Sequence, residues 1–143
     1  MQKQLKPIEA DHEHETIAVV GIGVCAHSLR SFEQVFSDID PDLGAVYLVA
    51  VRQQEGLDVG TVVEVLKRQV SMPVTIAADG ERLKPKQVFV GGPDDMITIE
   101  DGHVHIRPAA EPVGQRGAID SMLISIAEHA HDRAIAVILS GLG

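Results

Sequence analysis

The sequence is poor in aromatic residues and in positive charge. Aromatic residues make up 3% of it, with one tyrosine and no tryptophan, so the stacking platforms that bind single-stranded nucleic acid are missing. Lysine and arginine number 12 against 21 aspartate and glutamate residues, which gives a formal net charge of −9. Such a field repels phosphate backbones and anionic lipid surfaces. These deficits predict that nucleic acid is not a partner.

Cysteine and long apolar runs are also scarce. Cys25 is the single cysteine, so the chain cannot form an internal disulfide. No apolar run approaches the ~20 residues of a membrane-spanning helix. Residues 1–15 lack the hydrophobic core of a secretory signal peptide. These absences predict a cytoplasmic protein that is not inserted into a membrane.

Length and composition fit one folded domain. The 143 residues leave no room for a second full core, and 45% of them are hydrophobic. Residues 1–15 mix charged residues and histidine with almost no apolar residues, so we expect a flexible N-terminal leader. The domain itself is expected to span residues 16–143.

The first part of the domain has the pattern of a β-α-β unit. Residues 17–20 and 45–51 are short apolar runs, typical of strands that are buried on both faces of a parallel sheet. The first run is expected to stop at Gly21 and Gly23. Between the two runs, apolar residues recur at helical spacing and predict a helix: Leu29, Phe32, Val35 and Phe36.

A second helix and two further strands follow. Thr61 and Glu64 have the spacing of a capping box, in which two side chains satisfy open backbone donors of a helix's first turn. The apolar stripe behind them predicts a helix over residues 61–69. Residues 73–77 and 87–90 are expected to form the next two strands, separated by turn-forming residues.

The last part adds a hairpin, a helix and a strand. Residues 96–99 and 103–106 alternate in polarity around Gly102, which supplies the positive φ of a tight turn. Residues 134–139 are the last predicted strand. The fold class is therefore α/β, a three-layer, doubly wound, mainly parallel sheet (Rossmann-like) with a β-hairpin insertion. Its third helix is predicted from apolar residues at helical spacing: Ile119, Met122, Leu123, Ile126 and Ala130.

Ligand sites of such folds lie at the carboxyl ends of the strands. Residues 21–26 fit the G-x-G-x-x-A form of a dinucleotide fingerprint, whose glycines let the backbone approach a pyrophosphate. The second strand is followed by Arg52, not by the acidic residue that holds the ribose hydroxyls of NAD. An arginine there can bind a 2′-phosphate, so an NADP-type nucleotide-binding domain on residues 21–26 is one alternative. The other hypotheses predict no cofactor.

Three side chains that can carry chemistry follow the first two strands. Cys25 lies in a strand-to-helix turn, where amide donors and the helix dipole lower the pKa of a thiol, although a lone cysteine is more often a small buried hydrophobe. His27 is the nearest candidate base. Arg52 stays protonated at any ordinary pH, so it can bind an anion or favour a thiolate but cannot accept a proton. Cys25, Arg52 and His27 are therefore the candidate site residues.

Three His-x-His pairs occur, of which His103 and His105 lie on a predicted strand. Residues at i and i+2 of a strand point to the same face and can share a metal ion. A metal needs a third or fourth ligand, and no further ligand is spaced to supply it. We therefore predict a solvated hairpin face and no metal site. The other two pairs are His12 with His14 and His129 with His131.

In the order of its elements, the sequence resembles the catalytic domain of the CheB-type chemotaxis protein-glutamate methylesterases, hydrolases that remove methyl esters from receptor glutamates. The likeness runs from about Thr16 to the end of the sequence. It accounts for the hairpin, which a plain dinucleotide-binding domain does not need. It rests on segments that occur in the right order: residues 20–23, 44–49, 71–74, 79–80, 88–90 and 134–143.

The resemblance implies a serine hydrolase site, in which a Ser in the first glycine-rich turn attacks the ester, a His after strand two takes its proton and an Asp orients the His. Cys25 stands at the position of the Ser, and Arg52 stands at the position of the His. The Asp is expected just beyond Gly143, so the domain is expected to be truncated at its C-terminus. His27 and Ser28 replace the glycines that follow the nucleophile.

Such a site predicts a methylesterase domain that is inactive or weakly active, because losing one triad member costs orders of magnitude in rate. The domain would then serve a chemotaxis or related two-component pathway as a binding module for a methylated chemoreceptor or another signalling protein. An active cysteine-dependent ester hydrolase that uses Cys25 is the alternative, since a thiolate needs no base to attack. The uncovered sheet region at residues 134–139 also predicts self-association into a homo-oligomer.

Overall fold

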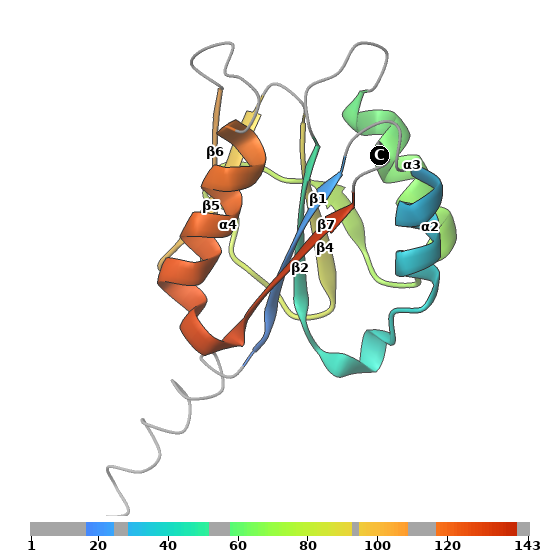
Figure 1. Cartoon of the computed structure of the whole chain (residues 1–143), viewed down its shortest axis with the longest axis horizontal. Coiled ribbons are helices and arrows are strands. Elements are labelled where there is room, and N and C mark those ends of the chain that lie inside the picture. Colours follow the sequence, from blue (N-terminus) through green and yellow to red (C-terminus); the bar gives the residue numbers. More distant parts are fainter. Residues whose placement is uncertain (1–16, 25–28, 52–57, 93–94, 109–116, 140–143) are drawn as a thin grey trace, which may run out of the picture.

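The computed structural model describes residues 17–24, 29–51, 58–92, 95–108 and 117–139. Within these ranges, a five-stranded sheet with the strand order β3-β4-β2-β1-β7 lies at the centre of the molecule (Figure 1). Every pair of neighbouring strands in it is parallel, which confirms the predicted α/β fold. Its strands are β1 (Val19–Val24), β2 (Val46–Val51), β3 (Val74–Ile76), β4 (Gln87–Gly91) and β7 (Ala134–Leu139).

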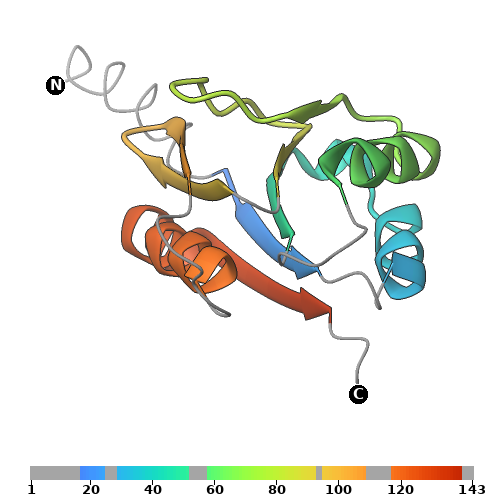
Figure 2. The same cartoon turned by 90° about the horizontal axis from the view of Figure 1, so that it is seen from above.

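Helices and a hairpin cover the two faces of this sheet. α2 (Leu29–Ser37) and α3 (Val59–Gln69) pack on one face, and α4 (Gly117–Ala130) lies on the other (Figure 2). β5 (Asp95–Glu100) and β6 (His103–Pro108) form a separate antiparallel hairpin on the α4 side. This arrangement confirms the three predicted layers and the hairpin insertion. Short 3₁₀ helices precede β2 (Pro41–Leu43) and β7 (His131–Arg133).

Side chains from the two faces of the strands build two hydrophobic cores. Val20, Ile22 and Val24 of β1 belong to the core shared with α2 and α3. Val19 belongs to the core shared with α4 and the hairpin. Every residue of β2 is buried, because both faces of that strand are covered. Among the described residues, no helix is long and apolar enough to cross a membrane.

Gly21 and Gly23 lie inside β1 and face α4. A Cβ added at Gly21 would lie 2.6 Å from Cδ1 of Ile126, and one added at Gly23 would lie 2.8 Å from Cγ2 of Ile119. The two glycines therefore let α4 approach the sheet closely. The prediction that the first strand stops at these glycines is wrong. Local pattern treats glycine as a breaker, whereas here its missing side chain makes room for a helix.

The position of Gly21 and Gly23 inside β1 argues against the nucleotide-binding alternative, which requires both glycines in a turn. In a dinucleotide fingerprint, the first glycine makes a tight turn and the second lets the pyrophosphate approach the backbone. Gly21 and Gly23 instead lie in a strand against α4 side chains, and neither has a positive φ. Cys25 and Ala26, the later fingerprint residues, lie outside the described residues. The structure thus gives no support to an NADP-type site on this segment.

The start of α3 differs from the prediction. The N-cap is Asp58, whose Oδ1 accepts a hydrogen bond from the Thr61 backbone N–H at 2.9 Å. The Thr61 hydroxyl donates to the same oxygen at 3.3 Å. The predicted capping box of Thr61 and Glu64 is therefore wrong, because Thr61 already lies in the first turn and a stronger cap precedes it.

The hairpin turn has the conformation that the sequence predicts. Glu100 pairs with His103 across the turn residues Asp101 and Gly102. Asp101 has a φ of 52° and Gly102 a φ of 77°. Positive φ at both central residues is typical of a type I′ turn, whose twist matches that of the flanking strands.

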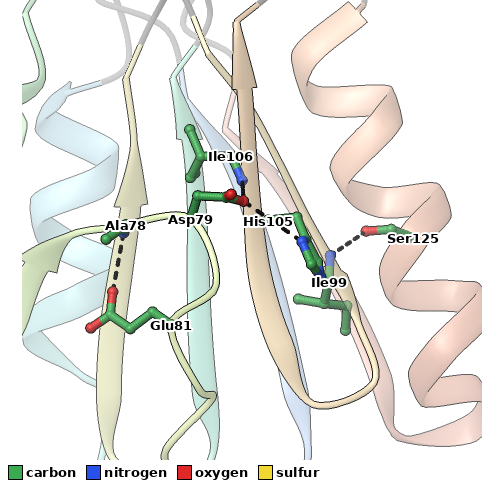
Figure 3. Close-up of polar contacts among 7 residues, drawn as sticks. All are labelled: Ala78, Asp79, Glu81, Ile99, His105, Ile106 and Ser125. Atoms are coloured by element: carbon green, nitrogen blue, oxygen red, sulfur yellow. Dashed lines mark hydrogen bonds and ion pairs between the residues drawn. The ribbon is translucent and has the colours of Figure 1, made fainter.

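Two sets of hydrogen bonds fix the hairpin against the rest of the domain. On one side, Ser125 Oγ of α4 accepts from the Ile99 N–H at 3.2 Å (Figure 3). The same hydroxyl donates to the Met122 carbonyl at 2.9 Å. On the other side, Asp79 Oδ1 accepts from the Ile106 N–H at 2.9 Å (Figure 3). The hairpin is thus held by α4 and by the segment that follows β3.

The segment of residues 80–82, which follows β3, runs beside β6 and pairs with its backbone. The Gly80 N–H donates to the Val104 carbonyl, and the Val104 N–H donates to the Glu81 carbonyl, both at 2.7 Å. Arg82 forms an isolated antiparallel bridge with His103. The sequence predicts only turn-forming residues here, because backbone pairing of an irregular segment leaves no periodic pattern of side chains.

Candidate functional site

The carboxyl ends of three neighbouring strands meet at one edge of the sheet. β1, β2 and β7 are in register, so that Val24 pairs with Val51 on one side and with Leu139 on the other. Neighbouring strands lie ~4.8 Å apart, so the carboxyl ends of these three strands lie side by side. This edge is the predicted location of the site.

The predicted site residues continue the chain from this edge. Cys25 directly follows Val24, and Arg52 directly follows Val51. Cys25, His27 and Arg52 all lie outside the described residues. The structure therefore brings together the strand ends from which Cys25 and Arg52 follow, while the side-chain geometry of the site stays a prediction.

The strand ends beneath the site are tightly packed. Val24, Val51 and Val90 are 0% exposed, which fixes the ends of β1, β2 and β4 in the core shared with α2 and α3. At the end of β4, a Cβ added at Gly91 would lie 2.9 Å from Cγ2 of Ile97 in the hairpin. A site built on such ends stands on rigid elements, as precise chemistry requires.

Helix N-termini supply positive potential on the same side of the sheet. α2 begins shortly after the end of β1, and α3 begins shortly after the end of β2. Free N–H groups give a helix N-terminus a partial positive charge. Asp58 caps α3, whereas α2 has no acidic residue in its first turn. The start of α2 therefore favours an anion nearby, such as a thiolate or an oxyanion.

Tyr47 is a buried residue of β2 whose pKa departs clearly from its ordinary value. Burial raises the pKa of the Tyr47 hydroxyl, and the Asp40 carboxylate raises it further. Tyr47 pairs with Val20, near the beginning of β1, so it lies away from the carboxyl edge. The raised pKa of Tyr47 therefore belongs to a residue outside the candidate site.

The histidines of the hairpin have separate partners. His103 Nδ1 lies 2.8 Å from the Asp101 carbonyl oxygen, and His105 Nδ1 lies 3.6 Å from Asp79 Oδ1. The described residues contain no group of three or more His, Cys, Asp or Glu that could hold a metal ion. A metal shared by His103 and His105 therefore has no support in this part of the chain.

Sequence reasoning missed a cavity at the opposite edge of the sheet. The cavity has a volume of about 490 Å³ and lies where β1 and β2 begin. Arg82 and Arg133 are both in its wall, although they are far apart in the sequence. No local motif links the two arginines, so only the folded chain reveals that they share a cavity.

Comparisons with known proteins agree with this order of elements. The family model of the CheB methylesterase matches residues 20–143. The protein-glutamate methylesterase/protein-glutamine glutaminase 3 of Paramagnetospirillum magneticum is 28% identical over 126 residues, which cover 87% of this chain and 35% of that protein. The protein-glutamate methylesterase/protein-glutamine glutaminase of Geobacillus kaustophilus is 29% identical over 130 residues, which cover 88% of this chain and 37% of that protein.

A solved structure has the same fold. The catalytic domain of the Thermotoga maritima CheB methylesterase superposes with a TM-score of 0.74 and 25% sequence identity. The match covers 89% of this chain and 69% of that one. By contrast, the chain spans little more than a third of the length of the curated relatives, 35% and 37%. The residues that match the family model include Cys25, His27 and Arg52.

Proposed function

Because the chain belongs to the CheB methylesterase family, we propose that it is a protein-glutamate methylesterase domain with little or no esterase activity. Its role is to bind a methylated chemoreceptor or another protein of a chemotaxis or related two-component pathway. The names of the curated relatives, which are methylesterases of protein glutamate, support this class of partner. The proposal includes a cytoplasmic location, which suits a chain whose single cysteine has no disulfide partner within it.

The strand register carries this proposal. Val24 and Val51 are direct partners, and the residues that follow them are Cys25 and Arg52. By resemblance, these are the family's nucleophile and base positions. The nucleophile and base positions therefore follow the ends of two adjacent strands, as an active member requires. The base position, however, holds Arg52, whose side chain cannot accept a proton.

Replacing the base by arginine affects both halves of ester hydrolysis. In the first half, a base takes the proton of the nucleophile and returns it to the leaving methanol. In the second half, it activates the water that cleaves the acyl-enzyme. Arg52 can stabilise negative charge but can do neither. The expected result is a domain that retains the fold and loses most of the rate.

Methanol release from a methyl-esterified receptor fragment tests the proposal. We expect the full chain to release methanol no faster than its Cys25→Ala variant. Calorimetry with the same fragment should show binding while the ester stays intact. Fast release that disappears in Cys25→Ala would overturn the proposal of low activity, and a fragment that neither binds nor reacts would overturn the proposed partner.

The double variant Cys25→Ser/Arg52→His provides a matched test of the two positions. If they correspond to the family's nucleophile and base, the double variant should release methanol at least about tenfold faster than Cys25→Ser alone. The single variant has the same hydroxyl nucleophile without the base, so it is the appropriate control. Equal rates for the two variants would count against this assignment of Arg52.

An active cysteine esterase is the second candidate function. The start of α2, whose first turn has no acidic residue, follows the end of β1 in the sequence and favours this candidate, because positive potential there stabilises a thiolate. The Cys25 thiolate would attack the ester carbonyl, expel methanol after protonation by water and form a thioester. Water would then cleave the thioester, which regenerates the thiol and leaves the glutamate carboxylate.

Alkylation separates this candidate from an inert thiol. A Cys25 thiolate predicts rapid labelling by iodoacetamide near neutral pH, with a rate that falls as the thiol is protonated at lower pH. A buried thiol predicts labelling only after unfolding. Labelling restricted to the unfolded chain would end the cysteine esterase hypothesis.

A further inference from the structure

The cavity at the amino edge of the sheet combines an apolar floor with a basic rim. Its lining residues belong to the beginnings of β1 and β2 and to the end of α4, among others. These three chain ends lie near one another at the lower edge of the sheet in Figure 1. The floor consists of buried residues from four different elements. These residues are Val19 (5% exposed), Val46 (1%), Ile99 (4%) and Ala130 (1%). At about 490 Å³, the cavity has the size of sites that bind small molecules.

The rim carries more basic than acidic groups. Arg82, Arg133, His103 and His129 line it, and Asp101 is the one carboxylate among the described lining residues. This excess contrasts with the whole chain, whose formal net charge is −9. Among the described residues, neither Arg82 nor Arg133 forms an ion pair with a carboxylate. Two guanidinium groups are therefore open to an external anion.

The Arg133 side chain and the Arg82 backbone are each held by a contact to the backbone of another segment. Arg133 Nη1 donates a hydrogen bond to the Ile17 carbonyl at 3.2 Å, which leaves further N–H groups of the guanidinium for a ligand. Arg82 is placed by its bridge to His103 and by the Leu83 N–H, which donates to the Gly102 carbonyl at 2.9 Å. The fold therefore fixes the backbone of Arg82 and the guanidinium of Arg133 at the rim.

We propose that this cavity binds a small carboxylic acid with an apolar body. The carboxylate pairs with Arg82 and Arg133, whose planar guanidinium groups match its two oxygens. The apolar body covers the floor formed by Val19, Val46 and Ile99, which removes apolar surface from water. A fully polar anion such as phosphate would leave that floor uncovered, so it fits the cavity less well.

The proposed site is separate from the candidate esterase site. Val19 and Val46 begin β1 and β2, whereas Val24 and Val51 end them. Five steps of ~3.3 Å along a strand place the two edges ~16 Å apart. The inference does not rest on the proposed function, and a ligand bound here leaves the carboxyl edge open.

Titrations of the isotope-labelled full chain, followed by backbone amide NMR, test the proposal. The probes are 2-naphthoate, its uncharged analogue 2-naphthamide and inorganic phosphate. We expect 2-naphthoate to shift the amides of Asp101, Gly102 and Ala130 and to bind at least about tenfold more tightly than the other two probes. Equal binding of the acid and the amide, tighter binding of phosphate, or shifts confined to other regions would overturn the proposal.

Charge-removing variants assign the binding to the rim. Arg82 is exposed, so Arg82→Gln should keep the fold and weaken 2-naphthoate binding about tenfold. Arg68→Gln on α3 removes the same charge outside the cavity and should leave the affinity unchanged. Equal affinities of Arg82→Gln and Arg68→Gln, with amide spectra that show an intact fold, would contradict the assignment.

Discussion

Gly23 occupies a position in β1 at which any side chain would meet α4. The three atoms nearest to an added Cβ all belong to Ile119 and lie between 2.8 and 3.1 Å from it. The β-branched Ile119 has few alternative χ1 angles with which to move away. We therefore expect Gly23→Ala to lower the free energy of unfolding by about 1–3 kcal/mol, as overpacking does. Urea unfolding followed by circular dichroism measures the change.

The Ile119→Ala background is the control for this prediction. Removing the Ile119 side chain removes the atoms that crowd the new Cβ. Gly23→Ala should then cost less, which appears as an interaction energy in a double-mutant cycle. The same cost in both backgrounds would show that α4 is not what excludes a side chain at Gly23.

Tyr47 gives the fold a dependence on alkaline pH. Its side chain is 4% exposed, and its ring centroid lies 6.1 Å from that of Phe36. Burial, reinforced by the Asp40 carboxylate, raises the pKa of its hydroxyl above the usual 10.0. Below that pH, the tyrosine is neutral in the folded and the unfolded chain alike. Above it, the unfolded chain loses the proton first, so this contribution to the free energy of unfolding falls as pH rises.

The titration of Tyr47 is directly measurable, because it is the single tyrosine and the chain has no tryptophan. The ultraviolet absorbance of tyrosinate should rise at a higher pH in the folded chain than in urea. Asp40→Asn keeps a cap acceptor and removes the charge, so it should lower the folded midpoint part of the way. Identical midpoints in the folded and unfolded chain would contradict the burial of the hydroxyl.

At the scale of elements, the first turn of α3 depends on Asp58. Its carboxylate accepts the Thr61 N–H that would otherwise have no partner within the helix. We expect Asp58→Ala to lower the free energy of unfolding by about 0.5–2 kcal/mol. Glu64→Ala is the matched control and should change it by less than about 0.5 kcal/mol, because Glu64 is an exposed side chain outside the cap. The reverse order of the two effects would restore the capping box of Thr61 and Glu64.

Elements that repeat a periodic pattern are those that sequence predicts well. β7 has the predicted bounds, Ala134–Leu139, and the hairpin forms around Gly102 as its alternation of polarity indicates. The predicted end of β1 and the predicted start of α3 are wrong. Both boundaries depend on contacts that a periodic pattern of apolar residues does not contain. Gly23 meets a helix from a distant part of the sequence, and Asp58 precedes the apolar stripe that marks α3.

At the scale of the whole molecule, one of the two candidate sites can be predicted from the sequence and the other cannot. Cys25 and Arg52 follow strands whose order the resemblance already implies, and the register of Val24 with Val51 agrees with it. The cavity with Arg82 and Arg133 has no such signal, since it forms where separate segments come together at the opposite edge. A site at the ends of parallel strands can be predicted from topology, whereas a site between layers needs the packed structure.

The open edge of the central sheet predicts self-association. Among the described strands, β7 is the last of the sheet and pairs with β1 alone. Its side chains Ile135 and Ile138 are 49% and 55% exposed, and they point to opposite faces of the sheet. The outer backbone groups of an edge strand, beside apolar side chains, form a template for pairing with another strand. We therefore expect the chain to dimerise in a concentration-dependent way through β7.

Sedimentation equilibrium of the full chain and two variants tests this expectation. Ile138→Lys places a charge on the edge strand and should weaken the dimer at least about tenfold, because a buried charge without a partner opposes pairing. Ile124→Lys on α4 replaces a side chain that is 57% exposed and belongs to a helix instead of the edge strand, so it should leave the dimer unchanged. A strictly monomeric chain would contradict the expectation, because it would show that β7 does not pair with a second copy. Equal weakening by both variants would instead place the contact on the α4 face of the molecule.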